Sequence, residues 1–491
     1  MGLMRFIVSP PTAVTEQTAQ QAYLAGMDRI PWGIRAQRAD GQLVLERDVS
    51  DSGTLQIPWY VEGYGHVTLS TGTLAERPQP YHLPLELARG KIGQIRNQQA
   101  EWESIGLVVP ETVNQTLAEA TRYLGQAVQA QRGSEESAVL AERAIYIALT
   151  AASLLADCYA EQALAVRRRG APKLPTLLGA NLGVSPLDDY AAGQYLQTFN
   201  AANVPLVWRE IETSDQTHCW DLSDRQVQWC RRQGLTVCGG PLVQLDHRSI
   251  PDWLCVCEGD FESLLTFASE FVRATVSRYR GNVDLWQCAG RANTANVLSL
   301  TEEEKVKLVA RAIELTRSLD AETPVVVSFD QPWAEYLSRR PMDFPPLHFA
   351  DALVRAGIGL TGLMLEINVG YCPGGTLLRD PIDFSRQLDY WAGLGVPLFV
   401  TMTAPSASHD DPLAQRRAKL PPDSWDPKAQ QNWVQRYVPL LLAKSYVQGI
   451  LWNQLRDSEP HDFPHAGLFD LRRHPKPALR QLASIRQAHL R

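Results

Sequence analysis

The stretch GLTGLMLEINV (359–369) is a short apolar run that leads into polar residues, and seven other runs in the last two thirds of the chain have the same form. In chain order, the other seven runs are LLGANLGV (177–184), VPLVWREIE (204–212), LTVCGGPLV (235–243), VDLWQCAGR (283–291), TPVVVSFD (323–330), VPLFVTMTAPS (396–406) and VQGILWNQLRD (447–457). Helical patterns separate nearly all of them, as in parallel βα units. The eight units predict an α/β fold, a (β/α)8 TIM barrel, with its chemistry at the C-terminal ends of the strands.

The chain has 491 residues, which is more than one ordinary core accommodates, so several domains are expected. Residues 1–85 are β-rich: GIRAQRADGQLVLERDV (33–49) alternates around a turn, and GTLQIPWYVEGYGHVTLSTGTL (53–74) supplies two more strands. This pattern predicts an antiparallel, sandwich-like domain, either a glycan-binding or a packing module. Residues 86–170 are helical and form a bridging region. GAPKLP (170–175) ends the last helix, so the barrel occupies 171–491.

Composition excludes several classes of protein. The net charge is −7 without a long Lys/Arg run, so no nucleic-acid partner is expected. No apolar stretch reads as a membrane span, and the N-terminal apolar run is too short for a signal peptide. We therefore expect a cytoplasmic protein unless a leader has been removed. The eight cysteines are interpreted as small buried hydrophobic residues in a reducing compartment. The sequence leaves the oligomeric state open.

No cofactor or metal is predicted. The chain lacks a dinucleotide-binding fingerprint, and the CPGG turn that follows 359–369 lacks the ending of a phosphate loop. His461 and His465 are four residues apart, but Pro464 argues against the helix that would bring them together as metal ligands.

The barrel region resembles the family 10 glycoside hydrolases, the xylanase-type barrels, over about residues 176–485. The resemblance is carried by LLGANL followed by Tyr195, Phe199 and Asn200, then by VWREIE, LTVCGGPLV with IPDWL, and RYRGNVDLWQCAGRAN. The last segment, QGILWNQLRD with GLFD and HPKPAL, resembles the family's final strand and closing helix. The resemblance implies a TIM barrel that acts on carbohydrate.

Both catalytic glutamates of that family are replaced. Arg291 stands where the resemblance places the acid/base, and Met402 lies in the run that replaces the nucleophile's. A retaining glycosidase needs two carboxylates about 5 Å apart, and an arginine cannot donate a proton at neutral pH. The chain is therefore not expected to be a standard xylanase.

Other carboxylates follow the predicted strands. Glu366 and Asn368 share the parity of one strand face, so if one points into the barrel mouth, both do. A buried glutamate needs a partner or a proton. Glu366 is therefore either ion-paired with Arg291 or a base, nucleophile or acceptor for a sugar hydroxyl, and the two roles are compatible if the pair also holds substrate. Asp330 and Asp457 are candidate acids. These three carboxylates are the predicted catalytic residues.

The predicted substrate-binding residues are the aromatic, amide and basic side chains at the strand ends. The aromatic residues either stack on a sugar ring or pack beneath a loop. The full set is Trp208, Arg291, Asn293, Gln331, Trp333, Asn368, Tyr371, Trp452, Asn453, Gln454 and His465. Neutral hydrogen-bonding groups beside flat aromatic rings favour an oligo- or polysaccharide partner.

Two functions are consistent with these residues. The first is a glycoside hydrolase with relocated carboxylates. The alternative is a non-catalytic glycan-binding or scaffold protein derived from such a hydrolase. A free carboxylate pair facing one cleft would favour hydrolysis, whereas a Glu366 locked against Arg291 would favour binding.

Overall fold

The computed structural model describes residues 2–39, 41–131, 134–415 and 425–491. The chain divides into two compact units. Unit 1 comprises Met1–Val166, Trp333–Met342 and Leu377–Asp389, and unit 2 comprises the remaining residues. The N-terminal region thus forms one unit with two segments from the barrel half of the chain, which the sequence does not indicate.

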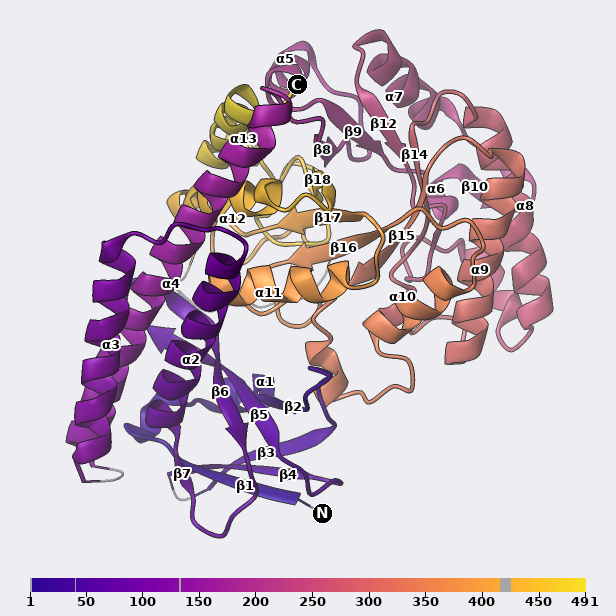
Figure 1. Cartoon of the computed structure of the whole chain (residues 1–491). Helices are drawn as coiled ribbons and strands as arrows, with labels where there is room; N and C mark the ends of the chain where they lie inside the picture. Colours follow the sequence, from indigo (N-terminus) through magenta and orange to yellow (C-terminus); the bar gives the residue numbers. More distant parts are fainter. Residues whose placement is uncertain (1, 40, 132–133, 416–424) are drawn as a thin grey trace. The chain divides into compact units, whose positions relative to one another are not determined.

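Unit 2 contains eight parallel strands that close into a barrel (Figure 1). Each strand pairs with the next, β12 pairs with β14, and β18 pairs back to β8. In order around the barrel the strands are β8 (Leu177–Asn181), β9 (Ala201–Val204), β12 (Thr236–Gly239), β14 (Leu285–Gly290), β15 (Val325–Asp330), β16 (Gly362–Asn368), β17 (Leu398–Thr403) and β18 (Val447–Trp452). The predicted TIM barrel is confirmed.

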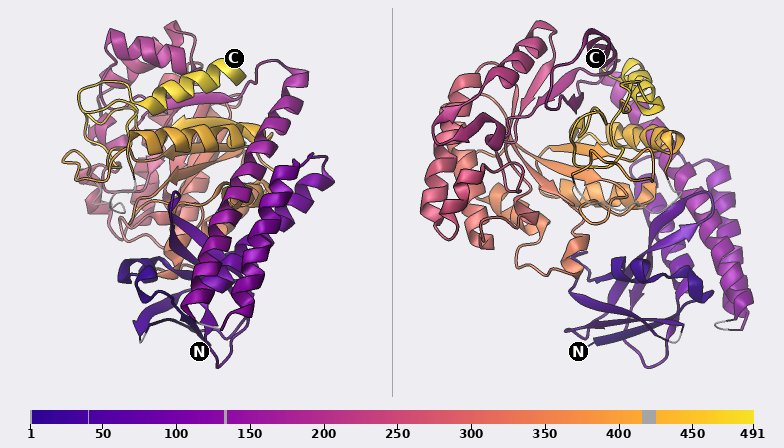
Figure 2. Two further views of the ribbon diagram at one scale, coloured as in Figure 1. Left: turned by 90° about the vertical axis from the view of Figure 1, so that its left-hand side faces the viewer. Right: turned by 180° about the vertical axis from the view of Figure 1, so that it is seen from behind.

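Helices lie outside the strands (Figure 2). They are α5 (Asp189–Thr198), α7 (Asp221–Arg232), α8 (Phe261–Tyr279), α9 (Glu302–Leu319), α10 (Pro346–Arg355), α12 (Pro427–Ala443) and α13 (Pro477–His489). Most of α11 (Pro381–Ala392) belongs to unit 1. Short elements follow some of the strands: α6 (Trp208–Ile211), the hairpin of β10 (Glu212–Ser214) and β11 (Thr217–His218), and β13 (Val243–Gln244), which extends the sheet beside β14.

The second barrel strand differs from its prediction. The run 204–212 was expected to form it, but β9 ends at Val204 and most of that run is loop and helix. Pro205 explains the difference, because proline has no N–H to donate to a neighbouring strand. The other seven strands begin at the first residue of their predicted runs or up to three residues after it.

The barrel interior changes from apolar to polar along the strands. A buried cluster fills it near the strand beginnings, formed by Cys238, Leu285, Val326, Met364, Phe399 and Leu451. Alternate residues of a strand face the same side. Glu366 and Asn368 therefore face inward with Met364, and Ser328 and Asp330 face inward with Val326. Polar side chains thus fill the barrel at its C-terminal mouth.

Unit 1 contains two sheets, as predicted. The first has the order β3 (Ile34–Ala39), β4 (Gln42–Arg47), β1 (Gly2–Ile7) and β7 (Tyr81–His82), in which only the short β7 pairs in parallel. The second joins β2 (Tyr23–Ala25), β5 (Gly53–Val61) and β6 (Gly65–Leu74), all antiparallel. Residues of both sheets, together with residues of α2 (Leu83–Ser104) and α4 (Glu135–Gly170), form one hydrophobic cluster.

One helix of unit 1, α4, has the length and composition of a membrane span, although no such segment was expected from the sequence. Among the described residues, α4 is long and apolar enough to cross a membrane by length and composition alone. Of its most apolar window, 61% is buried within the protein. It packs against α2 and α3 (Glu111–Gln129) through residues such as Ala148, Ala152 and Leu155. A buried core helix of this kind passes the same test as a membrane span.

A buried ionic cluster lies within unit 1. The Arg379 guanidinium donates to the Tyr23 hydroxyl at 2.6 Å, to Gln56 Oε1 at 3.0 Å and to Glu335 Oε1 at 2.9 Å, and it also pairs with Asp383. Arg379 is 2% exposed. These contacts join the two barrel-derived segments of unit 1 to its second sheet.

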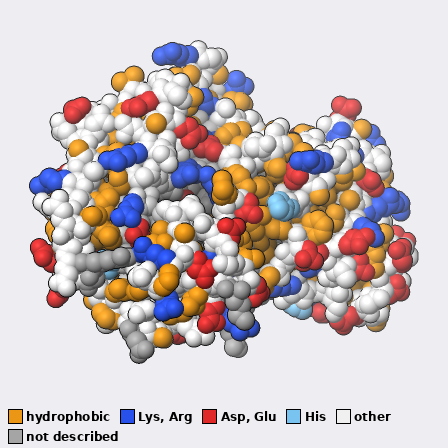
Figure 3. All heavy atoms as spheres, turned by 60° about the horizontal axis from the view of Figure 1, so that its bottom comes forward, with side chains coloured by type: hydrophobic (Ala, Val, Ile, Leu, Met, Phe, Trp, Pro, Cys, Tyr) orange, Lys and Arg blue, Asp and Glu red, His pale blue; other side chains and the backbone are white. Residues whose placement is uncertain are grey.

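Charged side chains are mixed on the molecular surface. On the face drawn in Figure 3, acidic and basic groups are interspersed rather than gathered by sign. This pattern agrees with a net charge of −7 that comes without a basic run.

Candidate functional site: a buried ion network at the barrel mouth

Arg291 lies at the centre of the polar mouth of unit 2. It follows β14 with φ of 57°, in the left-handed region, and its side chain is 6% exposed. Its Nε donates to Glu366 Oε2 at 3.0 Å, and its Nη1 donates to Asp246 Oδ2 at 3.0 Å and to Asp462 Oδ2 at 2.8 Å. One guanidinium therefore holds three carboxylates, from the end of β16 and from the segments after β13 and β18.

Glu366 has partners on both carboxylate oxygens. Besides Arg291 at Oε2, Ser328 Oγ donates to Oε1 at 2.9 Å, and Gln287 Nε2 donates to Ser328 at 2.8 Å. Burial raises the pKa of Glu366, although Arg291 opposes that shift. The ion pair between Glu366 and Arg291, one of the two alternatives drawn from the sequence, is thus present.

Asp246 and Asp462 were missed by the sequence analysis. Their side chains are 20% and 25% exposed, so they are the solvent-accessible carboxylates of the network. Arg248 also pairs with Asp462 and donates to Gln415 Oε1 at 2.7 Å. Both aspartates lie in loops. The only sequence signals beside them are the end of a predicted strand before Asp246 and the neighbouring His461 before Asp462.

The two aspartates are close together. Because each Oδ2 lies within 3.0 Å of the same Nη1, the two oxygens are at most about 6 Å apart, which is closer than the separation that inverting glycosidases use. A guanidinium at this distance favours the ionised carboxylate. Burial opposes ionisation of Asp246, but attraction to Arg291 together with hydrogen bonds from Ser249 and Gln244 outweighs it and lowers the pKa of Asp246. A general acid needs a proton, so this arrangement does not favour an acid role.

Asp330 lies beside Glu366 in the sheet, since the two residues are register partners of β15 and β16. Its Oδ2 accepts from Thr294 Oγ1 at 3.2 Å and from Gln331 Nε2 at 3.1 Å, and Asn293 bonds its backbone N–H and carbonyl. Asp330 is 2% exposed, and its Oδ1 has no hydrogen-bond partner among the described residues.

Asn368 also carries a buried polar atom that lacks a hydrogen-bond partner among the described residues. It lies two residues beyond Glu366 on β16, nearer the C-terminal mouth of the barrel. Its Oδ1 accepts from Thr403 Oγ1 at 2.9 Å and from Asn453 Nδ2 at 3.3 Å. Its Nδ2 is buried and has no hydrogen-bond partner among the residues that the structure describes. An acceptor on Asp330 and a donor on Asn368 thus remain unpaired on either side of Glu366 in the barrel interior.

The four aromatic candidates are all buried in packing contacts. Trp208 stacks on Phe271 and donates to Glu212 Oε2 at 2.7 Å, and Trp452 donates to the Ala466 carbonyl at 2.9 Å. Tyr371 donates to the Pro464 carbonyl at 2.9 Å. Trp333 belongs to unit 1, where its ring contacts that of Phe384. None of the four presents an open ring face, since their exposed fractions are 1–5%.

Asp457, Gln454 and His465 belong to a second polar cluster. Lys476 Nζ donates to Asp457 Oδ2 at 2.5 Å, to Ser406 Oγ at 2.7 Å and to the His465 carbonyl at 3.1 Å. Asp457 Oδ1 accepts from the Gly467 N–H at 2.7 Å and from Gln454 Nε2 at 3.1 Å. Both Asp457 oxygens therefore have internal partners.

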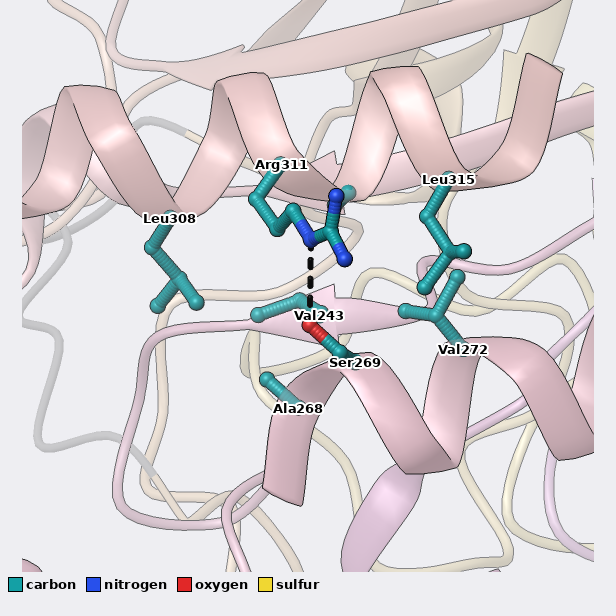
Figure 4. Close-up of a pocket in the computed structure, with 8 residues that line it drawn as sticks. Val243, Ala268, Ser269, Val272, Leu308, Arg311 and Leu315 are labelled. Carbon is teal, nitrogen blue, oxygen red and sulfur yellow. Dashed lines mark hydrogen bonds between the residues drawn. The ribbon is translucent and has the colours of Figure 1, made fainter. Parts of the chain in front are cut away.

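Within the described ranges, no group of three His, Cys, Asp or Glu side chains is placed to hold a metal ion. A gap of about 170 Å³ between α8 and α9 is too narrow for a water molecule, and Arg311 Nε donates to Ser269 Oγ across it at 3.4 Å (Figure 4). This gap is a packing feature of the outer helical layer.

Known structures similar to this chain include several xylanases. Xylanase 10B from Thermotoga maritima is 16% identical, covers 65% of this chain and 97% of its own, and has a TM-score of 0.49. Xylanase 10B from Thermotoga petrophila, solved with xylobiose, is 15% identical, covers 67% and 96%, and has a TM-score of 0.48. Xylanase B from Clostridium stercorarium is 18% identical, covers 65% and 98%, and has a TM-score of 0.47.

No protein-family model matches the chain, and no curated protein matches it. The xylanase-type barrel that the sequence resembles is also the type of barrel found among similar structures. The closed eight-stranded barrel is established by the strand pairing itself, so it does not depend on those matches.

Proposed function

We propose that the barrel mouth of unit 2 binds a hydroxyl-rich ligand, an oligosaccharide, without cleaving it. The observation that carries this proposal is the binding of Glu366, Asp246 and Asp462 by the single guanidinium of Arg291. Glycoside hydrolysis needs one protonated carboxyl group and one carboxylate free to attack or to activate water. A carboxylate held by Arg291 is poorly suited to either role.

The unpaired polar atoms indicate the kind of ligand. Leaving a buried acceptor or donor unpaired costs about 1–3 kcal/mol. A hydroxyl group can donate to Asp330 Oδ1 and can accept from Asn368 Nδ2, and a sugar presents several hydroxyl groups. Asp246, Asp462 and Arg248 are partly exposed, and they form the solvent-accessible part of the Arg291 network.

Binding and cleavage can be tested together. Purified protein is titrated by calorimetry with xylan-, cellulose- and chitin-derived oligosaccharides, and release of reducing sugar is measured in parallel. We expect binding of at least one series with no release. Asp330→Asn and Asn368→Ala should each weaken binding about tenfold, the effect of one lost hydrogen bond. Glu314→Gln, an exposed change on α9, is the matched control. Absence of binding to every series would overturn the proposal.

Hydrolysis is the second candidate function. It is favoured by the raised pKa of Glu366 and by the adjacent Asp330, since a raised pKa brings a carboxyl closer to the protonated form that a general acid needs. In that case the wild-type protein would release sugar, and Glu366→Gln would abolish release while Glu314→Gln would not. That result would replace the binding proposal with a hydrolase whose carboxylates are relocated.

A further inference from the structure

Hydrogen bonds of His461 hold together two segments at the barrel mouth of unit 2. The segment after β17 pairs with the segment after β18, because the Gln415 N–H donates to the His461 carbonyl at 2.8 Å and the His461 N–H donates to the Leu413 carbonyl at 3.2 Å. The side chain of His461 reinforces this pairing, with 4% of its surface exposed.

Both ring nitrogens of His461 face hydrogen-bond acceptors. Nδ1 lies 2.7 Å from the Glu459 carbonyl oxygen, and Nε2 lies 2.9 Å from Asp411 Oδ2. A carbonyl oxygen can only accept. Asp411 also accepts from the backbone N–H groups of His465 and Leu413, so it acts as an ionised carboxylate. Neutral histidine has one N–H, and both contacts therefore require the doubly protonated imidazolium.

The pinned segments carry groups of the Arg291 network. Asp462 follows His461 directly in the chain and binds both Arg291 and Arg248. Gln415, whose N–H bonds the His461 carbonyl, accepts from Arg248 on the other side. The positions of Asp462 and Gln415 at the mouth thus depend on the pairing that His461 secures.

We propose that His461 is a pH-sensitive latch that holds the rim of the barrel mouth in place while its ring is protonated and loosens it when the ring loses a proton. The latch itself does not depend on the proposed function. Only its consequence for ligand affinity rests on that function, because Asp462 is part of the proposed binding site.

The surrounding charges determine the direction of the effect. Burial disfavours the charged ring, but the bond to Asp411 and that to the Glu459 carbonyl outweigh burial and raise the pKa of His461 above its usual 6.5, with a smaller contribution from Asp457. The Glu459 carboxylate is itself engaged by Arg456 and Ser185. The latch contributes fully below the ordinary histidine pKa and is lost as pH rises through the raised one.

The other histidines nearby are less suited to the same role. His465 Nε2 lies 2.9 Å from the carbonyl of the exposed His409, and its Nδ1 is 3.6 Å from Asp411. Burial lowers the pKa of His465. His465 is therefore neutral where His461 titrates, and Asp411, whose pKa lies well below its usual range, stays ionised.

Hydrogen exchange of the full chain tests the latch. Protection of 408–415 and 458–467, corrected for intrinsic exchange, is measured from about pH 5 to about pH 9 in the absence of ligand. In the wild type, protection should fall about tenfold as pH rises, the effect of one charge-assisted hydrogen bond. His461→Gln should show low protection at every pH, and Asp411→Asn should move the transition to lower pH. His474→Gln, an exposed histidine outside both segments, is the control.

Two results would overturn the latch: wild-type protection that stays constant over the range, or a transition that persists in His461→Gln. Calorimetry with an oligosaccharide that binds then shows whether affinity follows the same transition. A latch without any glycan binding would leave the inference intact and refute the proposed function, so the two failures are distinguishable.

Discussion

Replacing Arg291 by methionine tests the ion network most directly. The change removes the guanidinium that holds Glu366, Asp246 and Asp462, while keeping most of the side chain's length. Removing one partner of a buried ion pair typically costs 3–5 kcal/mol, because the remaining charge is left uncompensated. Two aspartates at most about 6 Å apart add a repulsion of at least about 3 kcal/mol at an effective dielectric constant of about 20, before it is reduced by their partial exposure.

The loss of stability in Arg291→Met depends on pH, because protonation of Glu366 removes its uncompensated charge. Without Arg291, burial and the neighbouring Asp330 raise the pKa of Glu366 further above the usual 4.5, and the hydrogen bond from Ser328 opposes them. Between that ordinary value and the raised one, the folded state binds a proton that the unfolded state does not. The free energy of unfolding of Arg291→Met should therefore increase as pH falls through this window. We expect a loss of about 3–5 kcal/mol at neutral pH and a smaller loss near pH 5.

Denaturant unfolding followed by circular dichroism at both pH values measures this effect. Arg231→Met is the matched control, since Arg231 pairs with Asp284 on the surface with 40% and 37% of the side chains exposed, and such a pair contributes less than about 1 kcal/mol. Adding Glu366→Gln to Arg291→Met should restore part of the stability. A loss below about 1 kcal/mol, or one that does not shrink in acid, would refute the reasoning.

Two further changes test groups outside this network. Asp457→Asn should lower the free energy of unfolding by about 3 kcal/mol, because it leaves the buried Lys476 ammonium without its carboxylate; lost sugar release at unchanged stability would instead indicate a catalytic Asp457. Arg379→Met should destabilise unit 1 by about 3–5 kcal/mol, because Glu335 and Asp383 remain buried without it. Thermal unfolding of the full chain measures the second change, and an unaltered melting temperature would contradict it.

The fold was largely predictable from the sequence because its signals are local. Each barrel strand is a short apolar run followed by polar residues, so seven of the eight begin near their predicted positions, and the hairpin around Gly41 pairs Ala39 with Gln42 as expected. The exception, β9, shows a local signal that outweighed the apolar pattern, since Pro205 ends the strand.

The candidate site was predictable only in part. Strand parity placed Glu366 and Asn368 on one face, and the interior cluster around Met364 shows that this face points into the barrel. The sequence could not reveal Asp246 and Asp462, because loop residues carry no periodicity that fixes their direction. It also left open whether Trp208 and Trp452 meet a ligand or pack beneath loops, and the structure buries both.

The sequence by itself therefore determined the barrel, the places of most of its strands and the polar character of its mouth, since these follow from the pattern of each strand. Only the tertiary structure decided which charges meet. Arg291 binds carboxylates from residues 45, 75 and 171 positions away along the chain. Such pairings depend on the closure of the barrel and on the paths of its loops, which bring distant residues within hydrogen-bonding distance. No pattern within a single segment records that closure.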